Sequence, residues 1–161
     1  MTESTSLFFF ALGLHFALLQ FSYFFMLEVF FSSRALSYFV VLFFWLAGFL
    51  SGLNSRRKLL LGRLLLFGLA AYYAALLLNR LFSFRGATLA ATAACIAVSG
   101  AAPGYFFGGA QERSAAVRPV FLHENNGFVL GTLLSLLAML FAGKWLLVAG
   151  PLATALPLLL Y

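Results

Sequence analysis

The chain alternates long uncharged runs with short polar interruptions. Apart from His15, positions 4–27 carry no ionisable charge, and the further runs without Asp, Glu, Lys or Arg are 35–55, 64–79, 86–111, 125–143 and 145–161. A helix needs about 20 mostly apolar residues to cross the roughly 30 Å hydrocarbon core of a bilayer. The pattern therefore predicts six transmembrane helices, at about 6–31, 35–53, 59–81, 87–109, 125–142 and 145–161.

The composition supports this interpretation and excludes a water-soluble globule. Hydrophobic residues make up 64% of the chain and charged residues 9%, with a mean hydropathy of +1.05. Soluble domains are about 45–50% apolar and about 25% charged. Membrane barrel strands would be alternating runs of about 10 residues, which these longer runs do not match. We therefore expect one all-α integral membrane six-helix bundle over residues 1–161.

Basic residues gather at the ends of the predicted helices, where they can meet lipid headgroups. The net charge of +6 therefore indicates a bilayer and no nucleic acid. The densest cluster is Arg56, Arg57 and Lys58, in the short loop between the second and third helices. Because basic residues in short loops favour the cytoplasmic side, we expect both termini in the cytoplasm.

Small residues recur at four-residue spacing in three of the predicted helices. In lipid, such residues let helix backbones approach closely, so the spacing predicts helix packing or docking faces. An alternative is a hinge for alternating access, which needs repeats and broken helices; Pro103, Pro151 and Pro157 could supply breaks. The spaced glycines are Gly48 and Gly52, then Gly100, Gly104 and Gly108, then Gly127 and Gly131.

Ionisable residues within membrane segments are candidates for function because burying them is costly. His15 lies near the middle of the first helix, Glu28 near its end and Arg63 one turn inside the third. A buried histidine usually has a hydrogen-bonded packing role. Glu28 can pair with Arg34 near the headgroups or form a proton or cation site. If the chain transports a solute, we expect His15, Glu28 and Arg63 to line a cavity.

Cofactor chemistry has little support in the sequence. His15 and His123 could ligate a haem b, but both ligands would have to lie at one level around a flat macrocycle, so we expect no cofactor. Cys95 is the single cysteine, and no pair of metal ligands has helical i, i+3 or i, i+4 spacing. Glu124, before Asn125 and Asn126, is expected to cap the fifth helix or to form a docking point.

Catalytic motifs are also missing from the sequence. No nucleophile elbow, phosphate loop or dinucleotide fingerprint occurs. We therefore expect no enzyme activity.

Two stretches resemble known membrane families. Gly48-Phe-Leu-Ser-Gly52-Leu-Asn-Ser-Arg56-Arg57-Lys58 resembles the basic loop of major facilitator transporters. Ser99-Gly-Ala-Ala-Pro103-Gly104-Tyr-Phe-Phe107, with Glu124-Asn-Asn-Gly127-Phe-Val-Leu-Gly131, resembles the membrane domain of bacterial spermidine synthase-like proteins. The resemblance implies a fold similar to half of a major facilitator transporter, in a bacterial inner membrane. That family's catalytic domain would begin where these 161 residues end, so no catalytic residue is carried over.

The leading hypothesis is a non-catalytic multi-pass membrane subunit that anchors or organises a partner protein in a larger complex. Its expected partners are the lipid bilayer and other membrane subunits or further copies of the chain. The alternative is a small-molecule or ion transporter, either a homodimer of six-helix halves or a substrate-binding subunit. A haem-bearing electron-transfer subunit is the third option.

Overall fold

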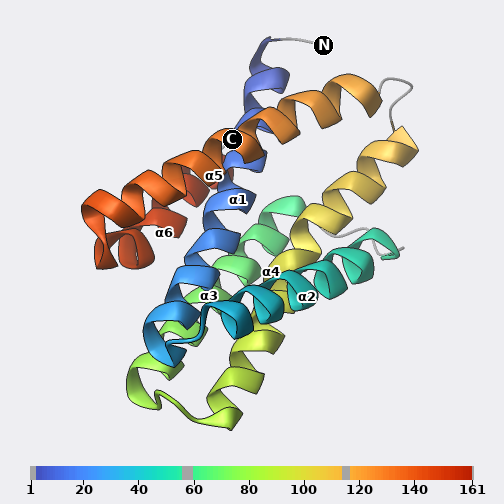
Figure 1. Ribbon diagram of the computed structural model, residues 1–161. Helices are drawn as coiled ribbons and strands as arrows, with labels where there is room; N and C mark the ends of the chain where they lie inside the picture. The colour runs from blue at the N-terminus through green and yellow to red at the C-terminus, as the bar shows by residue number, and fades with distance from the viewer. Residues whose placement is uncertain (1–2, 56–59, 114–116, 161) are drawn as a thin grey trace. The chain divides into compact units, whose positions relative to one another are not determined.

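The computed structural model describes residues 3–55, 60–113 and 117–160. Within these ranges the regular structure is entirely α-helical, which confirms the all-α six-helix prediction (Figure 1). Short turns within the described residues join α1 to α2, α3 to α4 and α5 to α6. The helices are α1 (Glu3–Phe31), α2 (Arg34–Leu53), α3 (Leu61–Leu81), α4 (Gly86–Arg113), α5 (Val117–Ala142) and α6 (Lys144–Leu160).

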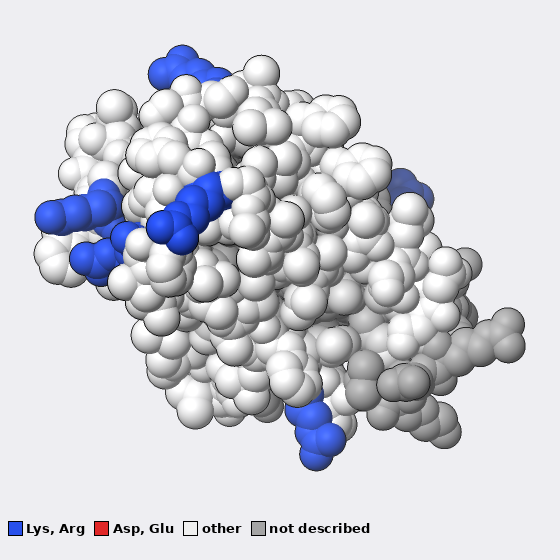
Figure 2. Space-filling view, turned by 90° about the horizontal axis from the view of Figure 1, so that it is seen from below, with Lys and Arg blue, Asp and Glu red and all other residues white. Residues whose placement is uncertain are grey.

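Five of these helices, α1 to α5, are long and apolar enough to cross a membrane. The sixth, α6, has 17 residues, which is the lower end of the range of about 17–25 residues that spans a bilayer. On the face that Figure 2 shows, a few Lys and Arg side chains lie among uncharged side chains of the described residues. The chain is thus a multi-pass membrane protein.

The helices form two compact units. Unit 1 contains residues 1–22 and 110–161, so it combines the N-terminal part of α1 with α5 and α6. Unit 2 contains residues 23–109, so it combines the end of α1 with α2, α3 and most of α4.

The start of α5 differs from the sequence prediction. The polar residues between Gln111 and Glu124 predict a loop with the fifth helix starting near Asn125, but α5 already begins at Val117. Pro119 lies in the first turn of α5, where proline needs no N–H partner and its fixed φ favours helix. Glu124 is therefore not a helix cap, and α5 begins about two turns before the predicted start.

The prolines do not divide their helices. Pro103 lies within α4, which continues to Arg113, and Pro151 and Pro157 both lie within α6. The α5–α6 turn favours glycine, because Gly143 has a φ of +53°, a conformation that other residues adopt less readily. Its N–H donates to the Met139 carbonyl over 3.1 Å.

Candidate functional site

The buried polar centre of unit 1 joins His15 of α1 to Thr154 of α6. His15 is fully buried, and its Nδ1 lies 2.9 Å from the Thr154 hydroxyl. That hydroxyl also lies 3.3 Å from the carbonyls of Gly150 and Pro151. If its hydrogen points to a carbonyl, His15 Nδ1 must be the donor. The bond then fixes the imidazole tautomer and links two helices.

The other imidazole nitrogen of His15 has no hydrogen-bond partner among the described residues. With Nδ1 protonated, Nε2 is a bare acceptor in a fully buried position. A buried acceptor of this kind is costly to leave unpaired. If His15 has a chemical role, such as binding a proton or a solute, the unpaired Nε2 is the atom that would perform it.

His123 lies on α5 and is partly exposed. No hydrogen bond or ring contact joins it to His15 in the described part of the chain, where His15 bonds to α6 instead. The described residues also hold no group of three His, Cys, Asp or Glu side chains that could bind a metal ion.

Glu28 pairs with Arg34 across the α1–α2 turn. The Arg34 Nε donates to Glu28 Oε1 over 2.7 Å, and the arginine side chain is 87% exposed while that of Glu28 is 27% exposed. Exposed pairs of this kind contribute at most about 1 kcal/mol. The geometry is that of an ion pair at the end of a membrane helix.

Arg63 lies on the first turn of α3, and its side chain is exposed. One ring contact locates it relative to Glu28 within unit 2. The Phe31 and Phe84 rings, 6.3 Å apart, place the α1–α2 turn beside the α3–α4 turn. Because α3 begins at the far end from its turn with α4, Arg63 lies about a helix length, roughly 30 Å, from Glu28. The structure therefore does not bring Glu28 and Arg63 together, and a cavity lined by both stays a prediction.

Unit 2 contains a buried polar centre that the sequence analysis did not single out. The Ser99 hydroxyl of α4 donates to the Gly68 carbonyl of α3 over 2.9 Å and lies 2.9 Å from the Tyr23 hydroxyl of α1. The Tyr23 ring meets that of Tyr72 edge to face, with centroids 5.0 Å apart. One serine thereby connects three helices.

A second polar link of unit 2 joins α3 to α4 near their turn. The Asn79 amide donates to the Thr92 hydroxyl over 2.7 Å and to the Ala75 carbonyl over 2.8 Å. Both Asn79 and Thr92 are fully buried. In the sequence, the one indication of this link was the amide residue Asn79 in an otherwise apolar run.

The spaced glycines of unit 2 bring α2 and α4 into backbone contact. At four of the five positions an added Cβ would lie 2.5 Å or less from a carbonyl oxygen of the facing helix, and at Gly108 it would lie 3.0 Å away. The contacts advance together along both helices, so α2 and α4 run in the same direction. The pairs are Gly48–Ala97, Gly52–Ala101, Gly100–Trp45, Gly104–Phe49 and Gly108–Leu53.

The glycines of unit 1 join α1 to α5 in the same way. Gly13 of α1, which the sequence analysis did not single out, meets the Glu124 carbonyl; Gly127 and Gly131 of α5 meet the carbonyls of Phe10 and Leu14. These contacts also advance together, so α1 and α5 are parallel. Glu124 itself is buried and shares the contact face of α5 with the two glycines.

The two glycine contacts are built alike. In each contact, one helix has two glycines four residues apart, and the partner helix has a glycine between the two residues that they contact. The first of the two glycines contacts the residue three positions before the partner's glycine, and the second contacts the residue one position after it. The α1–α5 contact thus repeats the α4–α2 contact, with α1 equivalent to α4 and α5 to α2. The equivalent glycines are Gly13 and Gly100, Gly127 and Gly48, and Gly131 and Gly52.

No family model, curated protein or solved structure matches this chain. The resemblance to bacterial spermidine synthase-like membrane domains therefore stays a prediction.

Proposed function

We propose that this chain is a non-catalytic multi-pass membrane subunit that anchors or organises a partner protein. The observation that carries the proposal is the use of its intramembrane polar side chains. The pairs His15–Thr154, Tyr23–Ser99 and Asn79–Thr92 each form a hydrogen bond between two helices of the chain itself. Hydrogen bonds of this kind hold membrane helices together, which suits a structural subunit.

The placement of the charged residues also supports a structural role. Glu28 is engaged by Arg34, and Arg63 lies at the other end of the helices of unit 2. A coupled transporter would need ionisable groups that share a solvated path within the membrane. The candidates Glu28 and Arg63 form no such group.

We further propose a bacterial inner membrane as the location, with both termini in the cytoplasm. Arg56, Arg57 and Lys58, which support this orientation, lie outside the described residues. Arg63 and Arg118 are exposed at helix ends that the alternating topology assigns to the same side. Cysteine accessibility in sealed vesicles tests the orientation, because cysteines introduced at exposed positions near Arg63 should react only with reagent on the cytoplasmic side.

The proposed function is tested by isolating the tagged chain from its own membranes in mild detergent. Native mass spectrometry should find a second protein at a fixed ratio, and that ratio should persist in Glu28→Gln and Arg63→Gln variants. Recovery of the chain without any second protein, from membranes in which it is expressed at its natural level, would contradict the proposal.

One observation supports the alternative of a transporter, namely the repeated glycine contact. Internal repeats of helices are common in secondary transporters, whose solute sites lie where the repeats meet. His15, whose Nε2 has no partner among the described residues, would be its first candidate for solute or proton binding. Uptake into liposomes by the purified chain, abolished by a His15 substitution that keeps the fold, would favour a transporter over a structural subunit.

A further inference from the structure

Helix α5 carries two stripes of opposite character on opposite sides. The buried stripe consists of Val120, Glu124, Gly127, Gly131 and Ser135, at spacings of three or four, and its glycines contact α1. The opposite stripe, here called the outer seam, is exposed along its whole length. It consists of Leu122, Asn126, Val129, Leu133, Leu136 and Leu140.

The outer seam has the spacing of a coiled coil. Its residues follow one another at alternating intervals of four and three, which is the a/d pattern of a heptad repeat over nearly three heptads. Asn126, Leu133 and Leu140 occupy the a positions, and Leu122, Val129 and Leu136 the d positions. The five apolar members are 47–76% exposed, so neither α6 nor the described part of α1 in unit 1 covers the seam.

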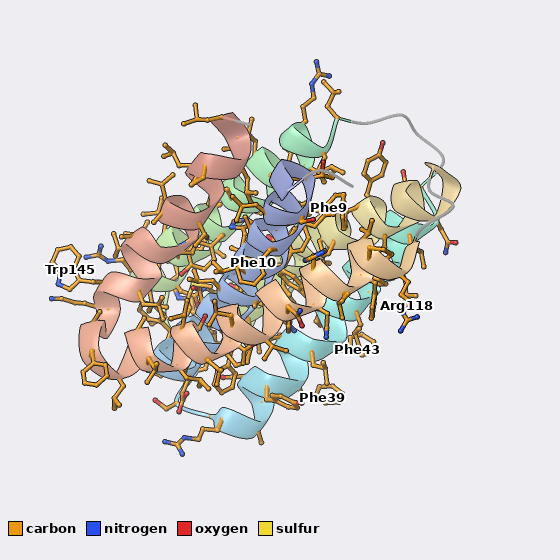
Figure 3. All side chains as sticks on the ribbon, turned by 90° about the horizontal axis from the view of Figure 1, so that it is seen from above. Phe9, Phe10, Phe39, Phe43, Arg118 and Trp145 are labelled. Atoms are coloured by element: carbon orange, nitrogen blue, oxygen red, sulfur yellow. The ribbon has the colours of Figure 1, made fainter. Side chains whose placement is uncertain are left out.

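Asn126 distinguishes this seam from an ordinary lipid-facing surface. Its side chain is exposed, and at 1.5 Å per residue it lies about 24 Å along the axis from Ala142, within the roughly 30 Å apolar core. Figure 3 shows the side chains that mark the two ends of this region, Arg118 at the start of α5 and Trp145 just beyond its end. Tryptophan and arginine are typical of membrane–water interfaces.

A lipid chain offers the Asn126 amide no hydrogen bond, whereas a second Asn126 offers both a donor and an acceptor. A carboxamide is self-complementary in this respect, and a single asparagine at an a position fixes the register of two-stranded coiled coils. Two copies inserted in the same orientation would meet across a two-fold axis along the membrane normal. Such an axis places Asn126 opposite Asn126 and Leu133 opposite Leu133.

We propose that two copies of this chain associate through the outer seams of their α5 helices. The contact is parallel and two-stranded, and Asn126 fixes its register. The Asn126 amides hydrogen-bond to one another, and the leucines of the two seams interdigitate at the crossing angle of about 20° usual for membrane bundles. This dimer requires no other protein and does not depend on the proposed function.

The first test is cross-linking of single-cysteine variants in liposomes that contain only the purified chain. Cys95 is first replaced by alanine, and cysteine is then introduced by Leu133→Cys or, as the matched control, by Leu134→Cys. Both leucines are exposed, but Leu134 points about 100° around the helix from the seam. We expect an oxidised dimer from Leu133→Cys and little from Leu134→Cys. Equal cross-linking of the two variants would overturn the proposal.

The second test measures the dimer equilibrium by energy transfer between labelled copies at decreasing protein-to-lipid ratio. Asn126→Ala should raise the dissociation constant by about three- to twentyfold, the range that one interhelical hydrogen bond gives in membranes. Asn125→Ala, which removes the neighbouring amide at the flank of the seam, should change it much less. A chain that is monomeric at every ratio, or insensitive to Asn126→Ala, would overturn the proposal and leave the proposed function untouched.

Discussion

The Tyr23 hydroxyl lies 2.9 Å from the Ser99 hydroxyl, which in turn donates to the backbone carbonyl of Gly68. Three helices of unit 2 meet at this one serine. A membrane interior supplies no water to replace such bonds, so each polar group there must find a partner in the protein. The use of serine, threonine and asparagine as connectors between helices is the main structural theme of this chain.

Removing the Ser99 hydroxyl should weaken unit 2 without unfolding it. Ser99→Ala loses the bonds to Tyr23 and Gly68, and we expect the free energy of unfolding to fall by about 1 kcal/mol. Denaturation of the purified chain by dodecyl sulfate in mixed micelles measures this change. Ser51→Ala, on an exposed position of α2, is the control and should have almost no effect. Equal effects of the two substitutions would argue against the Ser99 centre.

The glycine contacts predict that one added methyl group is enough to disturb the packing of α2 against α4. Gly100→Ala places a Cβ 2.5 Å from the Trp45 carbonyl oxygen, and backbone atoms cannot move aside as a flexible side chain can. We expect a loss of about 1–3 kcal/mol in unfolding free energy, as in other overpacked cores. Gly62→Ala is the matched control, because nothing lies within 4 Å of its added Cβ. A Gly62 variant less stable than the Gly100 variant would contradict the contact.

The His15–Thr154 bond predicts an energetic coupling between α1 and α6. His15→Ala and Thr154→Val should each lower stability, and the double variant should lose less than the sum of the two. We expect a coupling energy of about 0.5–1.5 kcal/mol from this double-mutant cycle. Strict additivity would mean that the two side chains do not interact in the membrane.

Proline substitutions can test whether α5 begins at Val117. Leu122→Pro would remove a helical hydrogen bond and clash with the preceding turn, so it should cost about 3 kcal/mol or more if α5 begins at Val117. Val117→Pro, at the first helical residue, should be tolerated. If both variants retain full stability, residues before Asn125 form a loop and the sequence-based boundary was the better one.

The number and approximate extents of the helices could be predicted from the sequence, because uncharged runs such as 35–55 have the length that a bilayer demands. The start of α5 could not be predicted in this way. Its first two turns contain Arg118, His123 and Glu124, and only Pro119 signals a helix start there. The polarity of a segment indicates where the chain leaves the hydrocarbon core of the bilayer, but it does not indicate where the helix begins or ends.

The polar contacts were predicted less well than the helices. The spacing of Gly48 and Gly52 indicated a packing face but could not name α4 as its partner. His15 and Thr154 are 139 positions apart, and Asn79 was hidden in an apolar run. These contacts depend on which helices are neighbours, and a single sequence contains no direct record of that. Gly13 went unnoticed because it has no second glycine on its own helix face.

The exposed aromatic pair of α2 illustrates the surface that remains available to lipid or to a partner. Phe39 and Phe43 stack with their ring planes 8° apart and their centroids 6.0 Å apart, and both side chains are exposed (Figure 3). They lie one helical turn apart on the face turned away from Gly48. In the structural interpretation, contacts outside the chain form on such faces, while the polar interior holds the helices together.

Solute uptake by the purified chain in liposomes tests most directly whether the polar interior has only a structural role, and His15→Asn is the decisive variant. The asparagine amide can replace the Nδ1 donor toward Thr154 but has no counterpart of Nε2, so it preserves the packing bond and removes any further chemistry. If the polar interior is structural, wild-type and His15→Asn liposomes will both take up ions and small solutes no faster than protein-free liposomes. Uptake by the wild type that disappears in a folded His15→Asn variant would contradict the structural interpretation and establish a transporter.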